Sequence, residues 1–215
     1  MSKTRRRLYT AIFVAALLWF YMFSPWTSAF RSFWVSMSAS AVILTFLALS
    51  FSDWKYSVRN IERPLLQLVL GIVLAFLLWG VFWVGDKLSS MMFDFARPEV
   101  DAVYSMKDGF PAWSIALLLI LLIGPAEEFF WRGYVQKTFV SLFKDRRWPE
   151  DTAFLVTTVI YAMIHVWSFN FMLVMAALVA GCIWGFIYRL RPALLPALVV
   201  SHALWDALVF VILPI

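Results

Sequence analysis

Charged residues are scarce in this sequence: Asp, Glu, Lys and Arg make up 14% of its 215 residues, whereas 63% are hydrophobic. Average soluble domains are about half apolar and roughly a quarter charged. A soluble chain of this length could not cover so much apolar surface, because small domains bury only part of theirs. The composition therefore favours a protein embedded in a lipid bilayer, where the abundant Trp and Phe (12 and 21 residues) are expected at the interfaces.

Cysteine and histidine are also rare. The single cysteine, Cys182, excludes an internal disulfide framework, and its apolar surroundings in the sequence indicate a small core residue. There is no internal repeat, low-complexity tract or glycine-rich nucleotide-binding loop. The net charge of +5 comes from cations that lie between apolar segments, so it is a topology signal and we expect no nucleic-acid partner.

Long apolar runs dominate the chain instead. A helix that crosses a bilayer needs about 20 mostly apolar residues. The first run also resembles a signal peptide, but Thr27, Ser28 and Ala29 form a weak cleavage site, so we expect an uncleaved helix. The sequence predicts an all-α polytopic membrane protein, a single transmembrane domain with seven spans at about 8–24, 33–51, 65–85, 112–136, 151–168, 170–188 and 192–213.

The cationic residues predict the orientation of these spans. Cytoplasmic loops of membrane proteins carry an excess of Lys and Arg. With the N-terminus in the cytoplasm, four cations lie outside (Arg31, Lys87, Arg97 and Lys107) and Arg132 lies within a span. The other thirteen lie inside: Lys3, Arg5, Arg6, Arg7, Lys55, Arg59, Arg63, Lys137, Lys144, Arg146, Arg147, Arg189 and Arg191. We therefore expect a cytoplasmic N-terminus, with an acidic outer loop at 86–111.

Only three spans carry ionisable groups well inside their boundaries. A charged side chain at the bilayer centre costs about 2.5–3.5 kcal/mol on insertion scales, so such groups persist where they pair, line a cavity or do chemistry. Both histidines of the chain are among them. We expect one shared polar cavity formed by the fourth, fifth and seventh spans, with six candidate site residues: Glu127, Glu128, Arg132, His165, His202 and Asp206.

Helical spacing predicts how these side chains pair. Glu128 and Arg132 are four residues apart with the acid first, which favours an ion pair on one helix face. Glu127 lies about 100° around the helix from Glu128, so one carboxylate can bind Arg132 while the other faces the cavity. His202 and Asp206 are also four apart, so Asp206 can accept a hydrogen bond from His202.

This set of side chains suits hydrolysis by water. A glutamate beside an imidazole in a pocket of low dielectric constant can act as a general base on water, and a second imidazole can donate to an oxyanion. No serine or cysteine lies in a recognisable nucleophile setting. If the fourth span ends at 136, Glu127 lies nearer to the cytoplasmic side than His165. Apolar residues continue to Phe143, however, and favour a longer or shifted helix. We therefore expect the side chains to meet at mid-depth or in the cytoplasmic half of the membrane.

At these residues the sequence resembles the CPBP family of CAAX proteases and bacteriocin-processing enzymes. That family has Glu-Glu-x-x-x-Arg, then Phe-x-x-x-His, then His-x-x-x-Asn or Asp on successive membrane helices. The corresponding residues here are Glu127-Glu128-x-x-x-Arg132, Tyr161-x-x-x-His165 and His202-x-x-x-Asp206. The motifs cover 112–206, which we take as the protease core; residues 1–111 carry no recognisable motif and have no assigned role.

The resemblance implies an intramembrane endopeptidase of the glutamic type that needs no cofactor. In that scheme Glu127 and His165 activate the water, Glu128 and Arg132 support the site, and His202 and Asp206 bind the oxyanion or position the substrate. Two residues depart from the pattern. Tyr161 replaces Phe and adds a hydroxyl that can bond within the cavity, and Asp206 stands where prenyl endopeptidases typically have Asn.

Several alternatives stay open at this stage. Glu, His, His and Asp could also ligate zinc. A non-catalytic immunity or peptide-binding protein could use the same cavity, and carboxylate–histidine chains also serve as proton relays in transporters, although the chain has no inverted repeat. As a protease, the protein would act on a membrane-associated protein or peptide, such as a C-terminal tail or anchor, and we expect it in a prokaryotic plasma membrane.

Overall fold

The computed structural model of the protein describes residues 2–30, 32–52 and 61–215. These residues form helices and short connections, without any strand, which confirms the predicted all-α fold class. Within the same ranges, seven helical segments are long and apolar enough to cross a membrane. Arg31, Lys55 and Arg59, which contribute to the predicted orientation, lie outside the described residues.

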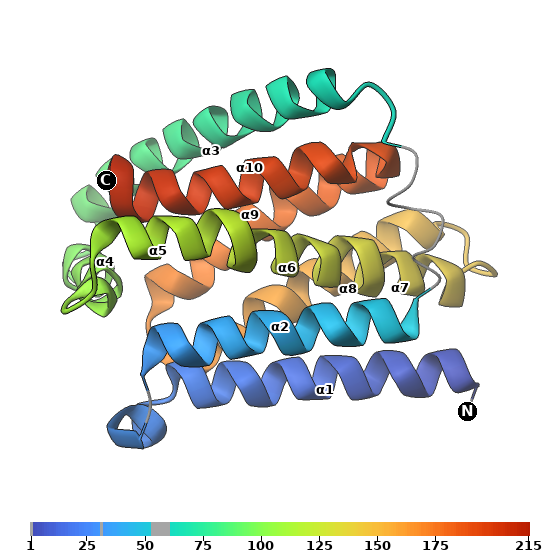
Figure 1. Ribbon diagram of the computed structural model, residues 1–215, viewed down its shortest axis with the longest axis horizontal. Helices are drawn as coiled ribbons and strands as arrows, with labels where there is room; N and C mark the ends of the chain where they lie inside the picture. The colour runs from blue at the N-terminus through green and yellow to red at the C-terminus, as the bar shows by residue number, and fades with distance from the viewer. Residues whose placement is uncertain (1, 31, 53–60) are drawn as a thin grey trace.

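The seven spans alternate in direction along one axis (Figure 1). Four are simple: α1 (Lys3–Phe23), α2 (Phe33–Phe51), α3 (Pro64–Met92) and α9 (Phe171–Leu190). The fifth joins α8 (Pro149–Met163) to the 3₁₀ turn η6 (Ile164–Ser168), and the seventh joins η7 (Pro192–Leu194), α10 (Leu195–Ala207) and the π-helical η8 (Leu208–Ile212). The fourth span joins α5 (Ala112–Leu118), η4 (Leu119–Ile123), α6 (Gly124–Glu128), η5 (Phe129–Gln136) and α7 (Lys137–Leu142).

Proline and capping side chains define where several helices begin. Pro64 and Pro149 occupy the first position of α3 and α8, where the missing backbone N–H costs nothing and the fixed φ suits a helix. Asn170 caps α9, because its side-chain oxygen accepts a hydrogen bond from the backbone N–H of Leu173 at 2.8 Å. The span boundaries therefore follow local chemistry as well as apolar length.

The two ends of the helix bundle differ in the chain termini and connecting segments that lie there. The N-terminus and the α7–α8 connection lie at one end, whereas the C-terminus and the short helix α4 (Ala96–Tyr104) lie at the other (Figure 1). The end that holds the N-terminus carries described cations such as Arg5, Arg146 and Arg191. This arrangement agrees with the alternation that we predicted from the charges, while the assignment of that end to the cytoplasm stays a prediction.

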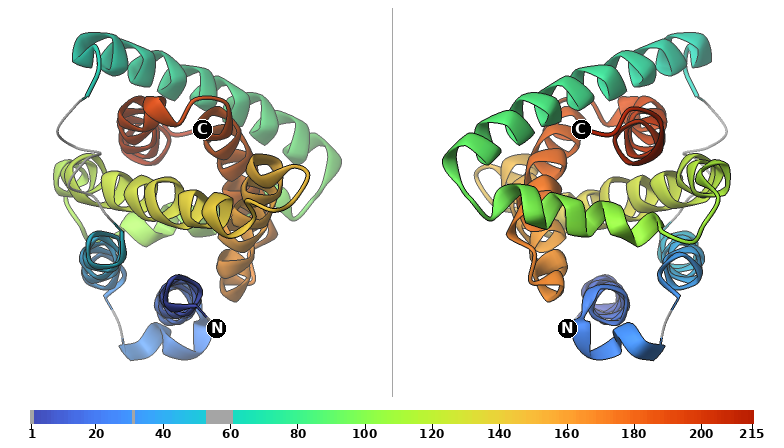
Figure 2. Two further views of the ribbon diagram at one scale, coloured as in Figure 1. Left: turned by 90° about the vertical axis from the view of Figure 1, so that its right-hand side faces the viewer. Right: turned by 90° about the vertical axis from the view of Figure 1, so that its left-hand side faces the viewer.

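Helix α10 lies between α3 and α6 (Figure 2). Small residues allow these close approaches, as is usual between membrane helices. A Cβ atom on Gly124 of α6 would lie 2.6 Å from Cα of Ala203, and one on Gly71 of α3 would lie 2.5 Å from Cβ of Val200. Because Ala203 adjoins His202, this contact also sets the distance between the fourth span and one of the candidate site residues.

The structure changes some of the predicted boundaries. The prediction that 86–111 is a loop is wrong for two parts of it: α3 continues to Met92, and residues 96–104 form α4. The acidic loop residue Asp86 is in consequence a buried part of α3, with 6% of its surface exposed. The fourth span extends to Leu142 instead of ending at 136, as its apolar sequence favours.

We expect Gly124→Ala to destabilise the protein by about 1–3 kcal/mol, because the added methyl group overlaps the backbone of α10. Thermal unfolding in detergent measures the change. Gly80→Ala is the matched control, because a Cβ at that position of α3 meets nothing within 4 Å and should leave the midpoint almost unchanged. Equal midpoints for the two variants would contradict the close contact between α6 and α10.

Candidate active site

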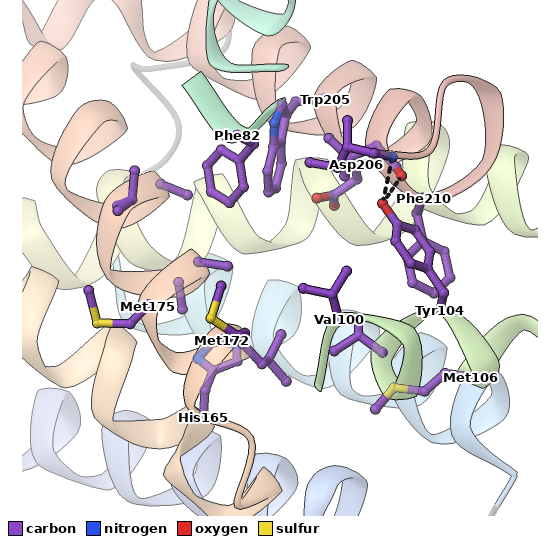
Figure 3. Close-up of a pocket in the computed structure, with 18 of the residues that line it drawn as sticks. Phe82, Val100, Tyr104, Met106, His165, Met172, Met175, Trp205, Asp206 and Phe210 are labelled. Carbon is purple, nitrogen blue, oxygen red and sulfur yellow. Dashed lines mark hydrogen bonds between the residues drawn. The ribbon is translucent and has the colours of Figure 1, made fainter. Parts of the chain in front are cut away.

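A cavity of about 490 Å³ opens among the spans, with Phe23 of the first span at its wall. Its wall is mainly apolar, with Phe, Trp, Met and Val side chains, and Figure 3 shows Phe82, Trp205, Met172 and Val100 around it. Polar groups also reach it: Glu127, Tyr161, His165, His202 and Asp206 all line the space. The fourth, fifth and seventh spans therefore meet at one cavity, as the sequence predicts.

Glu128 is the centre of the buried polar network behind this wall. Its side chain is fully buried, and its Oε1 atom accepts hydrogen bonds from Arg132 Nη1 at 2.7 Å and from His202 Nδ1 at 3.0 Å. The first contact is the predicted pair within the fourth span, and the second joins that span to α10. Arg132 also donates from Nη2 to the carbonyl oxygen of Gly181 in α9 at 3.3 Å. Glu128 and Arg132 thus connect the fourth span to α9 and α10 through hydrogen bonds.

Glu127 points to a different side of the same helix. It lines the cavity, whereas Glu128 does not, which confirms the expectation that the two carboxylates face different surroundings. Its Oε2 atom accepts a hydrogen bond of 3.0 Å from the hydroxyl of Tyr161. The second oxygen of Glu127 has no protein hydrogen-bond donor within the part of the chain that the structure describes. This carboxylate can therefore accept a proton from a molecule in the cavity.

His202 and Asp206 form a second acid–base pair. Nε2 of His202 lies 3.4 Å from Oδ2 of Asp206, while its Nδ1 contacts Glu128. The imidazole is held in place by stacking on the ring of Trp184, with 4.0 Å between centroids and 18° between planes. Because a carboxylate and an unprotonated nitrogen would repel each other, one of these two atoms must carry a proton. That proton is available at the cavity wall.

His165 lies on η6 and lines the cavity (Figure 3), and both of its ring nitrogens contact protein atoms. Its Nδ1 atom lies 2.8 Å from the carbonyl oxygen of Tyr161, and its Nε2 atom lies 3.0 Å from the indole Nε1 of Trp19 in α1. Sequence reasoning missed Trp19 because residues 1–111 carry no family motif. The available signal was a tryptophan near the C-terminal end of the first span, whose N–H group needs an acceptor where it is buried away from water.

Helix α4 covers one end of the cavity. Val100 and Tyr104 contribute to its wall, and Tyr104 lies next to Phe210 (Figure 3). The Tyr104 hydroxyl donates to the carbonyl oxygen of Val209 at 2.8 Å and accepts from the backbone N–H of Ile215 at 3.1 Å. Burial raises the pKa of Tyr104, so the hydroxyl keeps the proton that it donates.

A polar tie connects α4 to α9. The Glu99 carboxylate accepts a hydrogen bond from the backbone N–H of Met172 at 2.8 Å, and the backbone carbonyl of Glu99 accepts one from Nδ2 of Asn170 at 2.7 Å. On the other side, Arg97 lies 3.2 Å from Asp86 of α3. Ion pairs and hydrogen bonds between α4 and the ends of α3 and α9 therefore hold this end of the cavity.

The geometry bears on the zinc alternative. Among the described residues, no group of three or more His, Cys, Asp and Glu side chains is placed to hold a metal ion. Both nitrogens of each imidazole already contact protein atoms, namely Trp19 and Tyr161 for His165, and Glu128 and Asp206 for His202. A metal would have to displace these partners before an imidazole could bind it.

The comparison with family models supports the motifs. Residues 109–208, just under half of the chain, match the model described as "Type II CAAX prenyl endopeptidase Rce1-like". No curated protein and no solved structure matches the chain. The matched segment contains all six candidate site residues. The match indicates a protease of the CAAX type, and the segment 109–208 is similar to the CPBP/CAAX protease family that the three motifs predict.

Proposed function

We propose that the protein is a glutamic-type intramembrane endopeptidase that hydrolyses a peptide bond of a membrane-associated protein or peptide. The observation that carries the proposal is that Glu127, His165, His202 and Asp206, from three separate spans, line one apolar cavity. Such groups are costly at membrane depth, so their convergence favours a chemical role. The match of residues 109–208 to CAAX endopeptidases supports a protease in particular.

In the proposed reaction, Glu127 is the general base. It takes a proton from a water molecule in the cavity as the water oxygen attacks the carbonyl carbon of the substrate. The contact between His202 Nε2 and Asp206 Oδ2 is long, at 3.4 Å, so the proton that this pair holds can turn to the developing oxyanion and stabilise it. As the C–N bond breaks, the proton held by Glu127 passes to the leaving nitrogen, so that a carboxyl and an amine are released. His165 offers no free nitrogen while its present bonds last, so we assign proton transfer to Glu127.

The cavity wall supports an apolar substrate segment. A polar segment would lose its hydration on entry without finding enough partners among the Phe, Trp, Met and Val side chains. A C-terminal tail that carries a lipid, or an apolar anchor, meets this requirement. Asp206 in place of Asn changes the group next to the oxyanion, so prenylated and unprenylated tails are both to be tested. The basic N-terminal region and short connections support a prokaryotic plasma membrane.

We expect Glu127→Gln to lower cleavage by about 100-fold or more, because an amide cannot accept the proton from water. The substrates are two fluorogenic peptides that differ in one position, a farnesylated cysteine or a leucine, assayed in nanodiscs. New peptide termini in co-expressed membrane proteins, mapped by mass spectrometry, extend the search beyond these two.

Glu150→Gln is the control, because Glu150 is an exposed carboxylate at the start of α8, far from the cavity lining. Full activity of Glu127→Gln, with cleavage at the same bond, would be incompatible with the proposed base. A protective or binding effect that survives the change would instead support the immunity or peptide-binding alternative.

Arg132→Gln should destabilise the protein by about 3 kcal/mol or more, because it leaves the buried Glu128 carboxylate without its cation. Unfolding by detergent titration measures this change. Arg189→Gln is the matched control, because it breaks the 2.5 Å ion pair between Arg189 and Asp151. The side chains of Arg189 and Asp151 are 26% and 39% exposed, respectively. An exposed pair contributes at most about 1 kcal/mol. Similar losses in both variants would argue against Glu128 and Arg132 as the support of the site.

We propose that no metal takes part, and we expect activity to survive dialysis against EDTA and 1,10-phenanthroline. The physical reason is that both nitrogens of each imidazole already contact protein atoms. Cleavage rates before and after dialysis, together with the zinc content of the purified protein, provide the measurement. Loss of activity that added zinc restores would replace this mechanism with metal-assisted hydrolysis.

A further inference from the structure

The bond between Trp19 and His165 crosses from the unassigned N-terminal half of the chain to the matched segment. The two residues are 146 positions apart, both are buried, and the donor–acceptor distance is 3.0 Å. Trp19 has 1% of its surface exposed and meets the imidazole edge-to-face, with 5.8 Å between centroids and 80° between planes. Within the described parts of the chain, neither α2 nor α3 makes a polar contact with a candidate site residue.

The chemistry of the partners fixes the state of His165. An indole N–H group is a donor only, so Nε2 of His165 must be the acceptor and carries no proton. The backbone carbonyl of Tyr161 is an acceptor only, so Nδ1 must carry the proton and donate it. These two bonds specify a neutral imidazole with its proton on Nδ1. Protonation of Nε2 would bring two N–H groups face to face.

Other titratable groups share the cavity with His165. They are Glu127, Tyr161, His202 and Asp206, and the remaining aromatic contact from α1 is Phe23, whose ring lies 5.7 Å from the imidazole. Tyr161 connects the two sides of the site, since its carbonyl binds His165 and its hydroxyl binds Glu127. A charged imidazole at this place would attract the Glu127 carboxylate. It would then compete with the water molecule that Glu127 must activate.

We propose that Trp19 is a positioning residue of the protease: it holds His165 neutral, with the proton on Nδ1, and so leaves Glu127 free to take the proton from water. This inference rests on the proposed function for its effect on catalysis, but the state of His165 can be measured without any substrate. It also gives the N-terminal helix α1 a role, because α1 packs against η6 at the place where His165 leaves α8.

The experiment compares wild type with Trp19→Phe, which keeps an aromatic ring and removes the N–H group. Selective ¹⁵N labelling of histidine in nanodiscs gives signals from two imidazoles, and the His165 signal is the one lost in His165→Gln. In the wild type we expect His165 to be neutral with the proton on Nδ1. In Trp19→Phe we expect a mixture of tautomers and protonation at higher pH, because no donor opposes a proton on Nε2.

The kinetic expectation for Trp19→Phe is a fall in kcat of about tenfold or more with KM within about twofold. Groups that orient a functional histidine contribute 10- to 100-fold in metal sites, which sets this scale. The acid limb of the rate profile should move to higher pH. Trp79→Phe is the control: it also loses an indole N–H bond, 2.8 Å to the carbonyl of Leu213, but lies outside the cavity wall, so His165 and kcat should stay unchanged.

Three results would overturn the proposal: a wild-type His165 that is charged or carries its proton on Nε2, a Trp19→Phe spectrum and pH response equal to those of the wild type, or an unchanged kcat in Trp19→Phe. If wild type cleaves no substrate, the proposed function fails, whereas the nitrogen spectra still decide whether Trp19 sets the state of His165. The same spectral change in Trp79→Phe would also count against a specific role for Trp19.

Discussion

The buried carboxylate of Glu128 is the constraint on which the rest of the site depends. A carboxylate without solvent must be paired and hydrogen-bonded to be tolerated, and Glu128 meets this requirement with Arg132 on its own span and His202 on α10. Since Arg132 then reaches the backbone of α9, one buried charge orders three spans. The position of His202, and through it of Asp206, follows from the pairing of Glu128.

Division of labour between the adjacent glutamates follows from the same constraint. Glu128 is saturated on one oxygen and faces the interior, so it is unsuited to exchange protons with a substrate. Glu127 lines the cavity and has a single protein hydrogen bond, from Tyr161. Glu128 belongs to the buried network and Glu127 lines the cavity, because consecutive side chains on a helix point about 100° apart.

Much of the fold could be predicted from composition and apolar length. Spans are specified by the local sequence, so the second span at 33–51 agrees with the structure to the residue, and pairs at four-residue spacing, such as Glu128 and Arg132, follow from helix geometry. Contacts between spans were harder to predict from the sequence. The His202–Glu128 and Trp19–His165 bonds join residues 74 and 146 positions apart, and helix periodicity carries no information on which helices become neighbours.

Two local features also escaped prediction. The π-helical turns η4 and η5 on either side of Glu127 and Glu128 depart from the 3.6-residue repeat on which spacing arguments rest. Helix α4 is short and contains the charged residues Arg97, Glu99 and Asp101, so it carries no span signal. It is held by ion pairs and hydrogen bonds with distant residues such as Asp86 and Asn170. Both features depend on tertiary contacts more than on local preference.

The contact between Tyr104 and Ile215 has a practical consequence for handling the protein. Ile215 lies in the cavity wall and its backbone binds the hydroxyl of Tyr104, which itself belongs to the helix that covers this end. Any chain joined after Ile215, such as a purification tag, would begin at this wall of the cavity. The N-terminus lies at the opposite end of the bundle, so a label attached there leaves that wall untouched (Figure 1).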